Sequence, residues 1–261
     1  MDFRQPVILG RTGLRVGRLG VAGGYGVPAV AVERAFHDYG VNYFYWGSFR
    51  KEGMADAIRN LKSRRDELVI ALQSYDRSAF LMPITFERGL SALGIDHADV
   101  LILGWHNQMP SQRVLDAAYR LKEQGKLRHI AMSCHNRQFL GELARTPGQP
   151  IDIFMLRYNA AHRGAEQEIF PHLPTDATRP GVTAYTATSW GKLLKSAPVG
   201  MKPLRGRDCY RFALTHPAVN LCMTGPADVE QMDEALKAMD EGPMSQEELQ
   251  HAIKVGDFVH G

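Results

Sequence analysis

The stretch "SQRVLDAAYRLKEQGKLRHIAMS", residues 111–133, holds a complete helix-to-strand unit. Ser111 is a residue type that caps helix N-termini, and Gly125 is the type that ends helices. The run that follows, residues 127–133, is short and mostly apolar, which is typical of a strand buried on both faces. The stretch therefore predicts a helix over residues 111–125 followed by a buried strand.

The same unit recurs along the chain. Seven further runs are short, often β-branched and bounded by turn or charged residues, at residues 18–23, 41–46, 67–72, 98–103, 151–156, 181–186 and 219–224. Helical patterns lie between or after these runs, the clearest at residues 31–40, 54–63, 227–239 and 245–259. Eight strand–helix repeats in a chain of 261 residues predict a (β/α)8 TIM barrel of the α/β class.

Both ends of the chain add an element to this barrel. Residues 7–20 look like a β-hairpin with a glycine-rich turn from Gly10 to Gly13. The C-terminal helix begins with a capping box formed by Ser245 and Glu248. A doubly wound open sheet is the alternative fold, but residues 20–28 contain glycines without a GxGxxG fingerprint. No linker interrupts the chain, so we expect a single domain over residues 1–261.

Composition excludes several classes of partner. The net charge is only +3, from 31 basic and 28 acidic residues, so neither a nucleic acid nor a membrane surface is the expected partner. The three cysteines show no CxxC spacing, which leaves structural zinc and iron–sulfur clusters without support. Few cysteines and no N-terminal apolar segment predict a reduced, cytoplasmic protein. We expect a small-molecule substrate and no metal.

Six segments of the chain carry a resemblance to a known family, and they occur in that family's order. They are "LGRTGLRVGRLGVAGG" (9–24), "FERGLSALGIDHADVLIL" (86–103), "LKEQGKLRHIAMS" (121–133), "LRYNAAHRGAEQEIFP" (156–171), "TAYTATSWGKLL" (183–194) and "MTGPADVEQMDEAL" (223–236). Each is similar to a segment of the aldo-keto reductases, and the resemblance runs from about residue 7 to residue 258. It implies reduction of carbonyl groups with a nicotinamide cofactor.

The family's four catalytic positions carry other residues in this chain. The aspartate falls on Tyr45, the lysine on Gln73 and the histidine on Gly104. The proton-donating tyrosine falls on Arg50, or on Phe49 if the gap differs. A tyrosine donates its proton well only when its phenolate is stabilised, and Gln73 with Tyr45 cannot replace a Lys–Asp pair. The family's mechanism therefore cannot be transferred to these residues.

The resemblance also implies positions for a cofactor, NADP or NAD. Ser133 matches a carboxamide contact, with Cys134 as its neighbour, and Tyr185 matches the aromatic residue that stacks on the nicotinamide. Gly225 and Gln231 match the adenosine-phosphate site. The basic residue for the 2′-phosphate falls on Ala227, beside Asp228, whose charge would repel that phosphate, so NAD becomes a plausible cofactor.

Other candidates lie where a barrel carries its active site, at the C-terminal ends of the strands. His106 and His135 are candidate acid–base groups, because an unperturbed imidazole titrates near neutrality. Arg50, Arg137 and Arg157 could hold a carboxylate or phosphate, or could form surface ion pairs. Tryptophans at three strand ends favour a planar or aromatic substrate; these are Trp46, Trp105 and Trp190.

Three functions remain open at the level of sequence. The first is a nicotinamide-dependent oxidoreductase with an atypical proton relay, built on Ser133, Tyr185, Gly225 and Gln231. The second is a cofactor-independent lyase or isomerase, with His106, Tyr45 and Arg50 in acid–base roles. The third is a non-catalytic binding member of the fold. A Cys134–His135 nucleophile is disfavoured, because sequence neighbours on an extended segment point to opposite sides.

Overall fold

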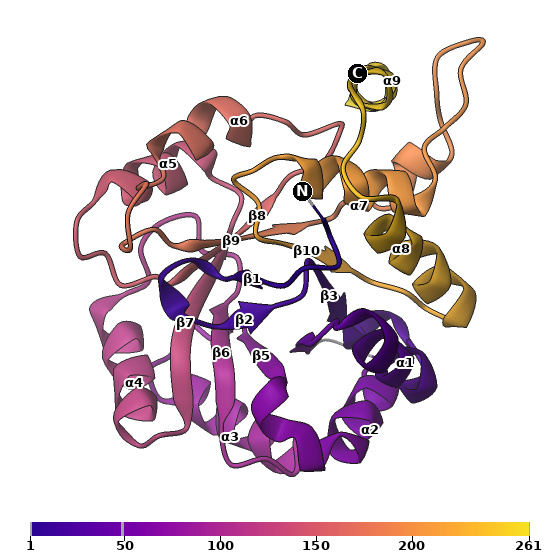
Figure 1. Cartoon of the computed structure of the whole chain (residues 1–261). Coiled ribbons are helices and arrows are strands. Elements are labelled where there is room, and N and C mark those ends of the chain that lie inside the picture. The colour runs from indigo at the N-terminus through magenta and orange to yellow at the C-terminus, as the bar shows by residue number, and fades with distance from the viewer. Residues whose placement is uncertain (1, 48–49, 261) are drawn as a thin grey trace.

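The protein is a closed barrel of eight parallel strands surrounded by helices (Figure 1). The structure is a computed structural model that describes residues 2–47 and 50–260. The barrel strands are β3 (Leu19–Ala22), β4 (Tyr43–Trp46), β5 (Val69–Ser74), β6 (Ala98–Leu103), β7 (Leu127–Cys134), β8 (Ile153–Arg157), β9 (Gly181–Tyr185) and β10 (Leu221–Thr224). Each strand pairs with the next, and β10 pairs with β3 to close the ring. All eight predicted runs are therefore confirmed as the barrel strands.

Helices follow the strands and cover the outside of the barrel. They are α1 (Ala29–Tyr39), α2 (Glu52–Asn60), α3 (Leu81–Leu93), α4 (Gln112–Glu123), α5 (Arg137–Arg145), α6 (Ala165–Glu168), α7 (Gly206–Thr215), α8 (Val229–Glu241) and α9 (Gln246–His260). The predicted capping box is present, since Ser245 Oγ accepts from the Glu248 N–H and Glu248 Oε2 accepts from the Ser245 N–H. Ser111 does occupy the N-cap position of α4, but its side chain makes no capping hydrogen bond.

The predicted N-terminal hairpin lies across one end of the barrel (Figure 1). Strands β1 (Val7–Ile8) and β2 (Arg15–Val16) pair antiparallel, and a short 3-10 helix, Gly10–Thr12, connects them. Leu9 is fully buried and packs against the start of β9, where a Cβ on Gly181 would lie 2.8 Å from its side chain. The hairpin therefore closes the N-terminal end and leaves the C-terminal strand ends as the open mouth.

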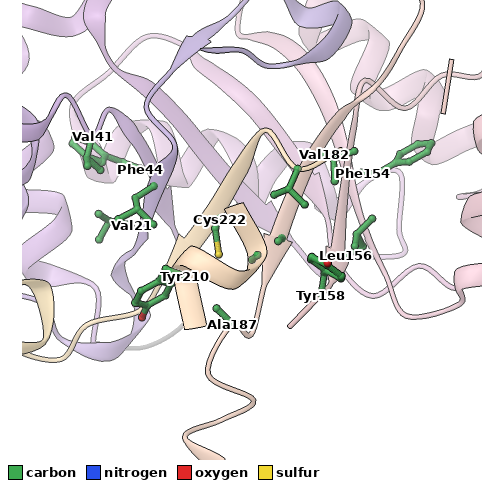
Figure 2. Close-up of a cluster of buried hydrophobic side chains, with 14 of the residues drawn as sticks. Val21, Val41, Phe44, Phe154, Leu156, Tyr158, Val182, Ala187, Tyr210 and Cys222 are labelled. Atoms are coloured by element: carbon green, nitrogen blue, oxygen red, sulfur yellow. The ribbon is translucent and has the colours of Figure 1, made fainter. Parts of the chain in front are cut away.

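Side chains alternate along the strands between the barrel interior and an outer layer under the helices. Tyr43 and Tyr45 belong to the interior cluster, while Phe44 between them packs in the outer cluster. Figure 2 shows outer-layer side chains from several strands, among them Phe44, Leu156 and Cys222. The alternation decides which strand-end residues face the mouth, because a period of two fixes the side of each side chain.

The last helix is held in place by a buried cation. Arg211 of α7 is 4% exposed and pairs with Glu248 of α9 at 2.6 Å. Its guanidinium also donates to the carbonyl oxygens of Gly242 and Pro243, between α8 and α9.

In the described part of the chain, no helix is long and apolar enough to cross a bilayer.

Candidate functional site

A cavity of about 550 Å³ opens at the C-terminal ends of β5, β6, β7 and β8. Its lining is basic and aromatic, with Arg77, Trp105, Asn107, His135, Arg137 and Arg157. Among the residues that the structure describes, the lining contains no carboxylate. Because barrel enzymes place their chemistry at this end, the cavity is the candidate active site, and its charge favours an anionic ligand.

A chain of hydrogen bonds runs from Arg157 through His135 to Tyr185. Arg157 Nη2 lies 3.0 Å from His135 Nδ1, and the Tyr185 hydroxyl oxygen lies 3.0 Å from His135 Nε2. A guanidinium can only donate, so Nδ1 must accept, and the neutral ring then carries its proton on Nε2. His135 therefore donates to Tyr185, and the phenolic proton of Tyr185 is left available for a ligand.

The surroundings of this chain keep the imidazole neutral and the phenol protonated. Burial lowers the pKa of His135, and the charge of Arg157 lowers it further. Burial raises the pKa of Tyr185 far above its ordinary value, although the nearby charge of Arg157 acts in the opposite direction. The resting state consequently presents a neutral imidazole and a phenol that holds its proton, with a cation one ring away.

Arg157 has no counter-charge among the residues that the structure describes. Its Nε atom is buried and has no hydrogen-bond partner in the described structure, and its guanidinium stacks over Trp190, 4.7 Å from the ring centre. The other cations of the cavity are engaged. Arg137 pairs with Glu168 at 2.6 Å, and Arg77 donates to the carbonyl oxygens of Gly104 and Trp105. Arg157 is thus the cation best placed to receive an anion.

Strained backbone gathers at the same end of the barrel. The non-glycine residues with positive φ in the described chain are Arg50, Trp105, Thr186, Ser189 and Trp190, and all of them follow barrel strands. Thr186 is the most unusual, because a β-branched residue rarely adopts its φ of 56°. Strain of this kind persists where the surrounding structure enforces it, and it concentrates at functional sites.

Two of the predicted catalytic residues, Tyr45 and Gln73, both lie next to Gly47, below the mouth of the barrel. Tyr45 is 8% exposed, and a Cβ on Gly47 would lie 3.3 Å from its hydroxyl and 3.5 Å from Gln73 Cβ. The site of the family's histidine is physically filled. A Cβ on Gly104 would lie 2.6 Å from both Gln73 Nε2 and the Tyr75 ring, so a larger side chain there would have to displace both.

The two remaining candidates, His106 and Arg50, lie apart from the cavity. His106 is 6% exposed, its Nε2 is buried without a partner in the described structure, and burial and Arg77 lower its pKa to about 4. Arg50 is exposed and its guanidinium covers Gly26, where a Cβ would lie 3.0 Å from Nη2. Phe49, the alternative position for the family's tyrosine, lies outside the described residues. Of the predicted catalytic set, only His135 lines the cavity.

The residues predicted to contact a nicotinamide are partly engaged within the protein. Ser133 is 3% exposed, and its hydroxyl accepts the Trp105 N–H at 2.9 Å. Cys134 lines the cavity, but its side chain is buried, and burial raises its pKa to about 11, which disfavours the thiolate form that a nucleophile needs. Tyr185 instead faces the interior and bonds to His135. The hydroxyl of Thr186, next along the chain, is buried without a partner in the described structure.

The residues predicted at the adenosine phosphate lie at the N-terminus of α8. Asp228 caps this helix by accepting the Gln231 N–H at 2.8 Å, and the Gln231 amide bonds Asp228 and the Ala227 N–H. A ring edge of Tyr25 covers Gly225, where a Cβ would meet it at 2.5 Å. The positive end of the helix therefore already holds a carboxylate of the protein itself.

Sequence reasoning overlooked one residue of the cavity lining and one residue bonded to the lining. Arg77 lines it from the loop after β5, and Tyr185 bonds to His135 although 50 positions separate them in the sequence. Alternation along β8 and β9 could have revealed part of this, since Arg157 and Tyr185 are paired neighbours in register. No cluster of three or more metal-ligating side chains was found in the described residues.

Solved structures share this architecture. An aldo/keto reductase from Klebsiella pneumoniae, in complex with NADP and acetate, matches 97% of this chain and 96% of its own with a TM-score of 0.75 and 20% identity. An aldo-keto reductase from Klebsiella pneumoniae in complex with NADPH matches with a TM-score of 0.74 and 21% identity. The match covers 98% of this chain and 96% of that one. The holo form of an aldo-keto reductase from Bacillus halodurans matches with a TM-score of 0.76 and 19% identity, and the match covers 96% of each chain.

The sequence itself matches no protein-family model and no curated protein. At such low identity, agreement over nearly the full length of both chains establishes the fold and not the activity. The chain thus has the barrel fold of the aldo-keto reductases.

Proposed function

We propose that this chain is a divergent oxidoreductase of the aldo-keto reductase superfamily, which acts on the carbonyl or alcohol group of a small substrate with Tyr185 as the proton donor. The observation that carries the proposal is the hydrogen-bonded chain from Arg157 through His135 to Tyr185 at the barrel mouth. Solved structures of the same fold contain bound NADP or NADPH, which supports the same interpretation.

The chemistry available at the cavity favours reduction over other reactions of a carbonyl group. Enolisation or elimination needs a base, but the described lining has no carboxylate and both nitrogens of His135 are engaged. Carbonyl reduction requires from the protein only a proton donor and positive charge near the carbonyl oxygen, because a cofactor would supply the hydride. Tyr185 and Arg157 meet that requirement.

Each residue of the chain has a separate role in this proposal. Tyr185 donates its hydroxyl proton to the carbonyl oxygen as negative charge develops there. The Nε2–H of His135 then stabilises the phenolate oxygen by a hydrogen bond, and the charge of Arg157 acts through the ring. A raised pKa makes Tyr185 a weak acid at rest, so this stabilisation matters most during proton transfer.

A nicotinamide cofactor would supply or accept the hydride when bound. The hydroxyl of Thr186, on strained backbone beside Tyr185, is buried without a partner among the described residues, and it would have to turn toward the mouth to bond a polar group of such a cofactor. A 2′-phosphate does not fit the other end, because the Asp228 carboxylate caps α8 and Ala227 offers no cation. These residues favour NAD over NADP, although the structural neighbours hold NADP or NADPH.

Proton transfer without a cofactor is the second candidate. It is favoured because two predicted cofactor positions are already occupied by contacts within the protein. The Ser133 hydroxyl accepts a hydrogen bond from the Trp105 N–H, and the ring of Tyr25 covers Gly225. Exchange of the C3 protons of phenylpyruvate with D2O, without added cofactor and faster than the spontaneous reaction, would move this candidate to first place.

Titration with NADH and NADPH tests the proposal, with quenching of tryptophan fluorescence as the signal. Trp105 and Trp190 are exposed at the mouth and serve as reporters. We expect saturable NADH binding that weakens in Thr186→Val, while Thr178→Val, before the opposite end of β9, leaves it unchanged. No saturable binding of either cofactor at millimolar concentration would overturn the proposal.

A further inference from the structure

We infer that the substrate carries a carboxylate beside its carbonyl group, as an aromatic 2-oxo acid does, and that Arg157 binds this carboxylate. The inference rests on the proposed function, since it names the substrate class of the same site. It depends on the charge balance of the cavity, the geometry around His135 and the aromatic side chains at the rim.

The charge balance requires an anion at Arg157. A partly buried guanidinium has lost hydration, and a cation without a counter-charge destabilises the fold unless something compensates it. In the described structure Arg157 has only neutral partners, the Nδ1 atom of His135 and the ring of Trp190. Its buried Nε–H has no acceptor within residues 2–47 and 50–260. A carboxylate bound in the cavity that Arg157 lines would supply the missing counter-charge.

Neither of the other arginines of the cavity can take this role as readily. The guanidinium of Arg137 is committed to Glu168 at 2.6 Å, which neutralises its charge. Arg77 donates 2.8 Å and 2.6 Å hydrogen bonds to the carbonyl oxygens of Gly104 and Trp105. These contacts fix Arg77 on the loop backbone, where it adds to the positive field without turning toward a ligand.

The geometry around His135 sets where the carbonyl must lie relative to the carboxylate. Tyr185 and Arg157 each sit 3.0 Å from opposite nitrogens of one imidazole ring, so a ring and two hydrogen bonds separate them. A 2-oxo acid spans a similar gap, because its two oxygens on neighbouring carbons each accept one hydrogen bond. The carbonyl oxygen then faces Tyr185 and the carboxylate faces Arg157, which is the orientation that proton donation requires.

The rest of the substrate lies against aromatic side chains. Trp105 lines the cavity, is 62% exposed and packs edge-to-face with Tyr75 at 5.4 Å between ring centres. Such large exposed rings lose contact with water when a flat apolar group stacks on them. An aromatic or conjugated tail on the 2-oxo acid would cover this wall, whereas a short aliphatic acid would leave it exposed.

The test separates binding of the acid from turnover. Phenylpyruvate and phenylacetaldehyde serve as probes, because they share the ring and the carbonyl but only the first has a carboxylate. Binding is followed by calorimetry without cofactor, and turnover by oxidation of NADH. We expect wild-type protein to bind phenylpyruvate at least tenfold more tightly than phenylacetaldehyde. Arg157→Met should remove that preference, while Arg163→Gln, which breaks an ion pair with Asp257 outside the cavity, should retain it.

The outcomes distinguish this inference from the proposed function. Equal binding of acid and aldehyde by the wild-type protein overturns the inference, whatever the variants do. Reduction of the aldehyde alone leaves the proposed function standing and also overturns the inference. Tight binding of the acid, lost in a folded Arg157→Met protein but without NADH oxidation, supports the inference and contradicts the proposed function. Circular dichroism of each variant confirms that it has folded.

Discussion

His135 donates its Nε2 proton to the phenolic oxygen of Tyr185 across 3.0 Å. The direction of this hydrogen bond follows from the other side of the ring, where Arg157 can only donate to Nδ1. One neutral imidazole thereby joins a cation to a phenol and leaves the phenolic proton free for a ligand. The proposed activity depends on that arrangement, and four predictions follow from it and from its surroundings.

The carboxylate at the N-terminus of α8 is predicted to select against NADPH. Asp228→Ser keeps a residue that caps helices well but removes the charge that a 2′-phosphate would face. We expect NADPH to bind about tenfold more tightly in the variant, which corresponds to about 1.4 kcal/mol, with NADH little affected. Fluorescence titration measures both constants, and an equal change for the two cofactors would contradict the assignment.

The filled space beside Gly104 is predicted to be intolerant of any side chain. In Gly104→Ala the new Cβ would collide with Gln73 and Tyr75, each 2.6 Å away, and overpacking of this kind costs about 1–3 kcal/mol. Thermal unfolding should therefore occur at a lower temperature. Gly206→Ala is the matched control, because its Cβ meets only Glu234 Cγ at 3.2 Å. A loss no greater than in the control would show that Gln73 and Tyr75 move aside.

Buried histidine is predicted to make the fold sensitive to acid. The pKa of His106 is lowered to about 4, so the unfolded chain binds a proton near pH 6.5 that the folded chain rejects. The free energy of unfolding should therefore fall as the pH drops from about 7 toward 4, by at most about 1.4 kcal/mol per pH unit from this residue. Urea unfolding of His106→Gln should show a shallower dependence; an unchanged slope would assign the effect to other groups.

The barrel could be predicted from sequence because its signals are local. Each strand is a short apolar run, and glycines such as Gly40 and Gly94 end their helices in the left-handed conformation. The hairpin followed from the turn between Gly10 and Gly13. One local signal was incomplete: Ser111 stands at the N-cap of α4, but its hydroxyl does not cap the helix.

The site was less predictable, because its contacts join residues far apart in the chain. His135, Arg157 and Tyr185 were each candidates, but His135 follows β7 whereas Arg157 and Tyr185 end β8 and β9, and no local pattern joins His135 to the other two. His106 looked equally suitable, two positions beyond Gly104, where the family's histidine falls. Its N–H instead bonds the Ser133 carbonyl after the left-handed turn at Trp105, and the side chain ends buried. Tertiary packing decided between the two histidines.

Removal of a single hydroxyl tests the central claim most directly. The measurement is the initial rate of NADH oxidation on phenylpyruvate by wild-type protein and by Tyr185→Phe, with circular dichroism as the check on folding. If Tyr185 is the proton donor, the variant keeps its affinity for the acid and loses about 100- to 10,000-fold in rate, the usual contribution of a positioned general acid. A folded Tyr185→Phe protein with the wild-type rate would contradict the account.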